Sequence, residues 1–85
     1  MLFTYLQKRM KSYHFPILIE HDSDGYFVSC PALQGCCTQG NTYEEAMHNI
    51  HDAVQLYVED VIARGDTLPE IGSVSFTTLD IKIAA

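Results

Sequence analysis

The chain has 85 residues, of which 47% are hydrophobic and 19% are charged, a composition that favours one globular domain and argues against disorder. A domain of this size has a thin core, so we expect it to bury further surface against a second copy of itself or a partner protein. The formal net charge of −6 disfavours direct nucleic-acid binding, which depends on Lys and Arg neutralising phosphates, and favours a basic partner protein.

The cysteines and the N-terminal residues indicate the cellular setting. Cys30, Cys36 and Cys37 are odd in number, and we expect no secretory signal ahead of them, so a reducing cytoplasm is the predicted location. The apolar residues 1–6 are too few to cross a bilayer, and we expect no membrane segment. We predict an N-terminal extension at residues 1–9 and a single domain over residues 10–85.

Residues 13–20 predict the first strand, because apolar side chains recur at every second position. These apolar residues are Tyr13, Phe15, Ile17 and Ile19. A polar break at residues 21–25 ends in Gly25, and residues 26–30 form a second apolar run. The pattern predicts a β-hairpin in which the glycine takes a positive φ.

A third strand and a helix follow in the chain. Residues 36–40 predict a short strand that completes an antiparallel meander. Thr42 and Glu45 fit a capping box, in which the threonine hydroxyl accepts a hydrogen bond from the backbone three residues later. Apolar residues then recur at spacings of three and four as far as Ile62, and Gly65 follows, so we predict one long amphipathic helix.

The last part of the chain predicts a final strand. Its apolar residues alternate with polar ones: Val74, Phe76, Leu79, Ile81 and Ile83. The alternation changes phase near Thr77 and Thr78, where we expect a bulge or bend. The order strand, strand, strand, helix, strand predicts an α+β fold with the helix across one face of the sheet. We expect the other face to be partly apolar and covered by another subunit, with Leu18, Phe27 and Tyr43 as candidates.

The acidic residues of the hairpin imitate the first half of a calcium loop. Glu20, Asp22 and Asp24 stand at alternate positions, as carboxylates that converge on a hard cation do. The closing position of such a loop needs a bidentate Glu, but Pro31 stands there. A metal-dependent nuclease could use the same carboxylates with Mg²⁺ if further acidic residues converged on them, and this stays an alternative hypothesis.

Histidine and cysteine offer weaker candidates for chemistry. His48 and His51 stand three apart on the predicted helix, a spacing that suits a metal, but no third ligand is indicated. Cys36 or Cys37 would need an adjacent base to act as a nucleophile, and no flanking motif provides one. We therefore predict that the chain is not an enzyme and has no catalytic residue, metal or cofactor.

Four stretches of the sequence, in this order and spacing, resemble the HicB antitoxin family. They are FPILIE at 15–20, DGYFV at 24–28, PALQGC at 31–36 and QGNTYEEA at 39–46. The resemblance extends over residues 10–83 and implies a partial ribonuclease-H-like fold that has lost catalysis. Many relatives add a C-terminal DNA-binding domain, which we do not expect in this chain.

The resemblance also implies a function. Members of the family neutralise HicA, a small basic RNA-cleaving toxin, by covering its active surface, and the acidic charge of this chain agrees with such a partner. For toxin contact we predict the hairpin, through Glu20, Asp22, Asp24 and Tyr26, with the carboxylates forming ion pairs and the tyrosine a large amphipathic contact. The acidic tip could instead serve solubility alone. A stand-alone oligomeric domain with a structural or regulatory role and no toxin is the alternative.

Overall fold

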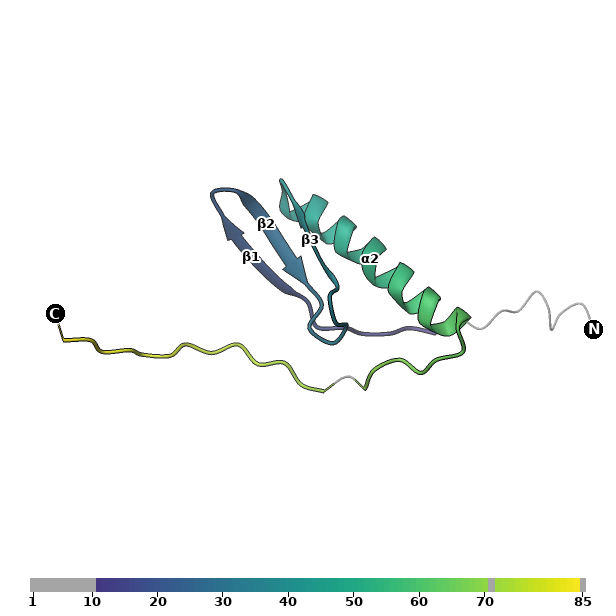
Figure 1. The fold of residues 1–85 in the computed structure, drawn as a ribbon. Helices are drawn as coiled ribbons and strands as arrows, with labels where there is room; N and C mark the ends of the chain where they lie inside the picture. The colour runs from purple at the N-terminus through teal and green to yellow at the C-terminus, as the bar shows by residue number, and fades with distance from the viewer. Residues whose placement is uncertain (1–10, 71, 85) are drawn as a thin grey trace, which may run out of the picture.

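A three-stranded sheet and one long helix form the body of the computed structural model, which describes residues 11–70 and 72–84 (Figure 1). In chain order the elements are β1 (Leu18–Asp22), β2 (Gly25–Ser29), β3 (Cys37–Gly40) and α2 (Tyr43–Ala63). The strands are antiparallel in the order β1-β2-β3, so β2 is central. The predicted α+β arrangement of a meander followed by a helix is confirmed, while the extension predicted at residues 1–9 lies outside the described residues.

A tight turn joins β1 to β2. Oδ1 of Asp22 accepts a hydrogen bond from the backbone N–H of Asp24 at 2.8 Å, an arrangement by which Asp side chains stabilise turns. Gly25 follows with a φ of 133°, and a Cβ at this position would lie 2.9 Å from the carbonyl oxygen of Gly40. Both the backbone conformation and the available space therefore require glycine, and the predicted positive φ is confirmed.

The first strand begins later in the chain than the alternation predicted. Residues 11–17 lie outside the sheet, and β1 continues to Asp22, into the predicted polar break. Three of the four predicted inward side chains pack against the core, whereas Tyr13 is exposed. Alternation therefore identified the buried side of this segment but not its backbone pairing. Pro16 lacks a backbone N–H and is therefore compatible with a segment that makes no hydrogen bonds to a neighbouring strand.

Both ends of α2 have the caps that the sequence predicted. The backbone N–H of Glu45 donates to Oγ1 of Thr42 at 3.1 Å, which satisfies one of the unpaired donors of the first turn. At the other end Gly65 has a φ of 74°, and its N–H donates to the carbonyl of Ile62 at 3.0 Å. A glycine in this left-handed conformation is the usual stop of a helix.

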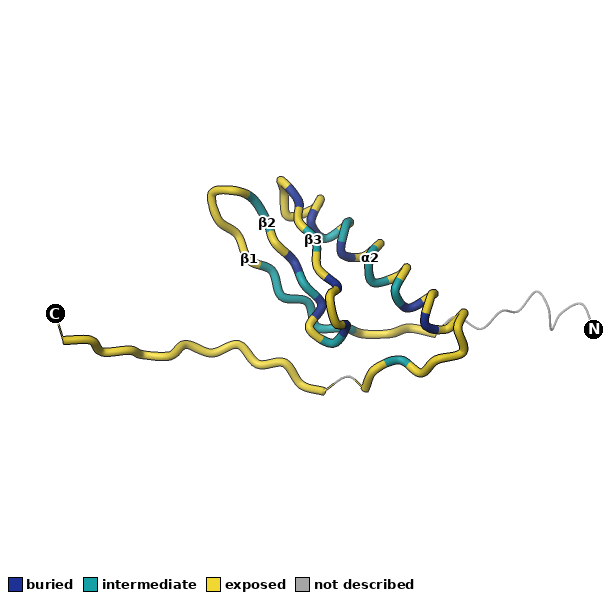
Figure 2. The backbone as a smooth tube through the Cα atoms, in the orientation of Figure 1, coloured by how far each residue is buried: buried dark blue, intermediate teal, exposed yellow. Residues whose placement is uncertain are grey.

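The core lies between the sheet and α2 (Figure 2). Its buried members come from β2, the turn after it and the first half of α2: Val28, Cys30, Leu33, Cys36, Ala46 and Ile50. The backbone N–H of Cys30 donates to the carbonyl of Cys36 at 2.9 Å, which closes the connection between β2 and β3. A Cβ on Gly40 would lie 2.5 Å from the backbone nitrogen of Ala46, so β3 and α2 touch backbone to backbone.

The predicted final strand is not formed. Residues 72–84 are assigned to no strand and extend away from the body, exposed along their length (Figures 1 and 2). Their apolar side chains are between 50% and 88% exposed: Val74, Phe76, Leu79, Ile81 and Ile83. A strand needs a hydrogen-bonded neighbour, and this segment has none among the described residues. The bulge predicted near Thr77 and Thr78 is accordingly not formed, because a bulge requires two paired strands.

Candidate functional site

The strand register divides the predicted site residues between the two faces of the sheet. Glu20 pairs with Phe27, and His21 pairs with Tyr26. Residues paired across antiparallel strands project to the same side, and successive residues project to opposite sides. Glu20 and Phe27 therefore lie on the face turned away from α2, which we call the outer face, whereas Tyr26 lies on the helix side. The structure does not bring Glu20 and Tyr26 together.

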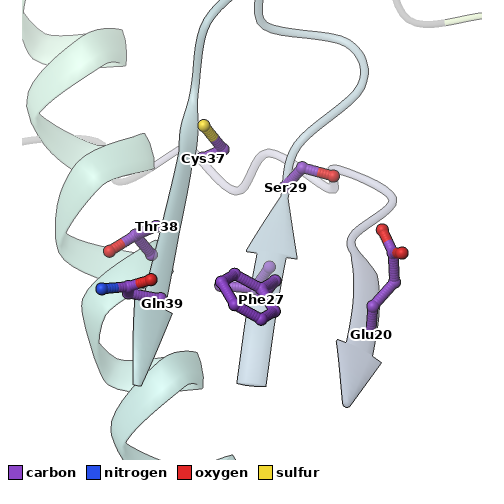
Figure 3. A pocket seen from close by; sticks show the side chains of 7 residues that line it. Glu20, Phe27, Ser29, Cys37, Thr38 and Gln39 are labelled. Atoms are coloured by element: carbon purple, nitrogen blue, oxygen red, sulfur yellow. The ribbon is translucent and has the colours of Figure 1, made fainter. Parts of the chain in front are cut away.

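The outer face contains an open hollow of about 360 Å³ around Phe27 (Figure 3). All three strands contribute to its lining: Glu20, Phe27, Val28, Ser29, Cys37, Thr38 and Gln39. Figure 3 shows the Phe27 ring between Glu20 on β1 and Gln39 on β3. Phe27 is 38% exposed, which agrees with the predicted apolar character of this face. Among the lining residues, Glu20 alone carries a carboxylate.

This arrangement fits a protein surface better than a small molecule. Sites for small ligands are concave and bury most of the ligand, whereas this hollow is shallow and open. An exposed aromatic ring with a charged group at its border is the pattern of a protein contact, in which the ring is the apolar anchor and the charge lies at the rim. The outer face can therefore receive an apolar side chain of a partner with a basic group beside it.

The two aspartates at the hairpin tip differ in their surroundings. Asp22 accepts the backbone hydrogen bond from Asp24 and so stabilises the turn, although its side chain is also exposed. Within residues 11–70 and 72–84, the side chain of Asp24 forms no hydrogen bond or ion pair. By strand parity Asp22 lies on the same side as Glu20, so these two carboxylates face the same way along β1.

Tyr26 belongs to an aromatic cluster that the sequence interpretation missed. Its ring stacks on His21 with centroids 4.0 Å apart and planes 7° apart, and it meets Tyr43 of α2 edge to face at 6.2 Å. Tyr26 is consequently half-buried between the hairpin and the start of the helix. The turn length was the available signal, because a two-residue turn places His21 and Tyr26 directly opposite each other.

The helix histidines pair with a carboxylate. Nε2 of His48 lies 3.3 Å from Asp52, and Nδ1 of His51 lies 3.5 Å from the same residue. Across the described ranges, no three side chains of His, Cys, Asp or Glu are placed to hold a metal ion.

No helix in this part of the chain is long and apolar enough to cross a membrane.

The adjacent cysteines have opposite environments. Cys36 is buried with Cys30, while Cys37 is exposed on the outer face. Burial raises the pKa of the Cys30 and Cys36 thiols above their ordinary value, because desolvation disfavours the thiolate. These two thiols are therefore less nucleophilic than a free cysteine.

Several known proteins are similar in sequence to the folded body of this chain. A profile of the HicB-like antitoxin of bacterial toxin–antitoxin systems matches residues 15–81. A UPF0150 protein of Synechocystis is 44% identical over 59 residues, which are 68% of this chain and 75% of that protein. A UPF0150 protein of Helicobacter pylori is 42% identical over 67 residues, 79% of this chain and 90% of that protein.

A named antitoxin is among the relatives. Antitoxin HicB 1 of Photorhabdus laumondii is 30% identical over 76 residues, which are 88% of this chain and 49% of that protein. The matching profile includes the whole sheet, α2 and most of the extended segment after it. The chain therefore belongs to the HicB-like antitoxin family of bacterial toxin–antitoxin systems.

Proposed function

We propose that this chain is a non-catalytic antitoxin module that binds and neutralises a small, basic, HicA-type RNA-cleaving toxin. The observation that carries the proposal is the outer face, where Phe27 forms the floor of an open hollow and Glu20 borders it. The opposite face of the sheet is covered by α2, whereas no element of the described residues covers the outer face. Membership of an antitoxin family and a net charge of −6 support the same conclusion.

The parts of the predicted site have different roles in this proposal. Glu20 and Asp24 offer carboxylates to basic toxin residues, and Phe27 supplies the apolar anchor that the sequence interpretation did not include in the site. Asp22 adds charge but also stabilises the turn. Tyr26 lies on the helix side, so a toxin reaches it only by extending over the hairpin. We therefore propose that the main contact is the outer face and that Tyr26 is a secondary contact.

The expected contributions to the binding free energy indicate that Phe27 provides most of the affinity. Exposed ion pairs contribute about 0.2–1 kcal/mol each, whereas a central aromatic anchor contributes about 2 kcal/mol or more when truncated. The carboxylates act mainly on the association rate, because opposite charges steer the encounter of two proteins. The salt dependence of binding should consequently appear in the association rate.

The proposal extends to the fold and the surroundings of the chain. We propose that the meander with α2 is a partial ribonuclease-H-like fold, which the strand order and the following helix support. The exposed thiol of Cys37 fits a reducing cytoplasm. Direct nucleic-acid binding is not part of the proposal, since Arg64, one of the few cations of the body, pairs with Asp60 at 3.2 Å and Asp66 at 3.4 Å.

A pull-down followed by a titration tests the function. Tagged full-length chain is recovered from extract of its native cell, and a small basic protein at near-equal stoichiometry is identified by mass and purified. RNA cleavage by that protein should stop when the chain is added. Recovery of such a protein whose RNA cleavage is unaffected by the chain, or recovery of the chain alone, would contradict the proposal.

One truncation and one charge reversal locate the contact. Phe27→Ala and Glu20→Lys should each weaken toxin binding by about tenfold or more. Glu59→Lys is the matched control, because Glu59 is exposed on α2, away from the outer face. It should change the affinity by less than about twofold. Equal losses for Glu20→Lys and Glu59→Lys would exclude a localised contact at the outer face.

A further inference from the structure

We propose that the outer face recognises an arginine side chain of its basic partner, with the guanidinium stacked on Phe27 between Glu20 and Gln39. The inference rests on the proposed function and names the residue that this face receives. Three features of the described residues support it: an aromatic ring that is open to solvent, a carboxylate on one side of the ring and a side-chain amide on the other.

The three side chains form a row across the sheet. Glu20 pairs with Phe27, and Phe27 pairs with Gln39. Residues paired in this way project to the same face, with their Cβ atoms about 4.5–5.5 Å apart. Figure 3 shows the Phe27 ring in the middle of the row. The register of three strands, rather than a loop, therefore places an aromatic ring between two polar groups.

The ring of Phe27 is open because its neighbours along β2 are small. Gly25 and Ser29 lie two residues away on the same face of the strand. Gly25 has no side chain, and Ser29 adds only a hydroxymethyl group to the lining of the hollow. Among the described residues Phe27 stacks on no other ring, in contrast to Tyr26. A planar group of a partner can therefore lie against this ring.

The polar groups beside the ring have capacity for a cation. Glu20 is exposed and forms no ion pair within residues 11–70 and 72–84. Gln39 binds Asn49 of α2 through its backbone carbonyl at 2.9 Å, which leaves its side-chain oxygen for the outer face. A carboxylate and an amide oxygen are both acceptors for the N–H groups of a basic side chain. The row therefore combines an apolar surface with acceptors for positive charge.

Arginine fits this row better than lysine or an aliphatic side chain. Its guanidinium is planar and weakly hydrated, so it stacks on aromatic rings, and its N–H groups form a fork that matches a carboxylate. When two of these groups donate to Glu20, others remain for Oε1 of Gln39. Lysine has a compact, strongly hydrated ammonium without a flat face. An aliphatic side chain would cover Glu20 and leave its charge unpaired.

Two substitutions of Phe27 separate the effect of the ring from that of apolar area. Phe27→Leu should weaken binding of the basic protein recovered by pull-down about fivefold or more, because it removes the aromatic face. Phe27→Tyr keeps the ring and should stay within about threefold of the original affinity. The amide spectrum of α2 reports that each variant is folded. Equal affinities of the Leu and Tyr variants would overturn the proposal.

Gln39→Glu provides a test by gain of affinity. A second carboxylate beside the ring should tighten binding about threefold, since an arginine retains N–H groups on that side. Gln55→Glu is the matched control, because it adds the same charge on α2, and it should change the affinity by less than about twofold. Equal effects of the two substitutions would contradict an arginine in this row.

A double-mutant cycle identifies the occupant directly. Each arginine of the recovered basic protein is changed to lysine, which preserves the charge. One of these changes should weaken binding to the original chain about tenfold and to the Phe27→Leu variant by less than about twofold, since the same stacking is lost only once. The absence of any arginine coupled to Phe27 would overturn the proposal.

Alkylation of Cys37 separates failure of this inference from failure of the proposed function. Cys37 is exposed on the outer face, whereas Cys30 and Cys36 are buried and serve as internal controls. The bound partner should slow the reaction of Cys37 with iodoacetamide about tenfold or more. Protection of Cys37 with inhibited RNA cleavage, but without a coupled arginine, would overturn the arginine contact and leave the antitoxin proposal standing. An unprotected Cys37 in the complex would contradict the outer-face contact and overturn both.

Discussion

The rings of His21 and Tyr26 stack nearly parallel across the hairpin, with centroids 4.0 Å apart and planes at 7°. Tyr26 in turn meets Tyr43 at the start of α2. Three aromatic rings therefore connect β1, β2 and the helix at the end of the sheet where the turn lies. This contact fixes the orientation of the hairpin relative to α2 and, with it, the position of the outer face.

Removing the stacked ring should destabilise the protein. We expect His21→Ala to lower the free energy of unfolding by about 0.5–1.5 kcal/mol, the usual value of an aromatic pair. Glu20→Ala is the control, because it lies next in the strand but on the other face, and it should change the stability by less than about 0.5 kcal/mol. Urea denaturation measures both, and equal losses would show that the stacking contributes nothing.

The close approach of β3 and α2 should make Gly40 intolerant of any side chain. A Cβ there meets backbone atoms of Ala46, so we expect Gly40→Ala to cost about 1–3 kcal/mol or more through overpacking. A Cβ on Gly72 meets nothing within 4 Å, and Gly72→Ala should be close to neutral. Thermal unfolding of the two variants compares them, and similar midpoints would contradict the backbone contact.

The helix cap should depend on a hydroxyl at position 42. Thr42→Ala removes the acceptor for the Glu45 N–H and should cost about 1 kcal/mol. Thr42→Ser keeps the acceptor and should retain most of the stability. Denaturation followed by the helical circular dichroism signal measures the difference, and equal losses in the two variants would exclude capping by the hydroxyl.

The buried thiols should make stability fall in alkaline solution. The folded-state pKa of Cys30 and Cys36 is raised by burial, so the folded protein holds these protons more tightly than the unfolded chain. Their contribution is complete below the ordinary cysteine pKa of about 8.5 and is lost as the pH rises through the folded value. Replacing both residues with Ala should flatten the alkaline part of a plot of unfolding free energy against pH. An unchanged slope would contradict this origin.

The hairpin tip should contribute charge to toxin binding. Changing Asp22 and Asp24 together to Lys should weaken the affinity by at least about tenfold, because two charges are reversed beside the outer face. Because Asp22 also stabilises the turn, Asp24→Lys alone serves as the variant that leaves the turn bond to Oδ1 in place. A calorimetric titration with folded variants measures the affinity, and unchanged values would remove the tip from the contact.

Local patterns predicted most of the folded body. The meander, the positive φ of Gly25 and both helix caps depend on residues close together in sequence, and the structure confirms them. The start of β1 was predicted wrongly, because alternation reports which side chains are buried and does not report backbone pairing. The predicted final strand is absent from the described residues for a related reason. Residues 72–84 have the alternating pattern of a strand, but this pattern does not show whether a neighbouring strand is available for pairing.

The candidate site was predicted less completely than the fold. Residues 21–25 were predicted to form one polar break, although His21 and Asp22 belong to β1. Phe27 was assigned to the face away from the helix, but Glu20 was grouped with Tyr26, although these two residues lie on opposite faces. Counting a two-residue turn would have placed Glu20 opposite Phe27 and so on the same face.

The sequential order of the elements has a consequence for biosynthesis. Each strand pairs with the next strand along the chain, and α2 packs on the two strands that precede it. Contacts between neighbours in sequence close short loops and favour fast folding. The sheet, the helix and the outer face can therefore form as soon as Ala63 has left the ribosome, before the residues that follow it are available. A nascent chain would then present its surface for the toxin before its own synthesis is complete.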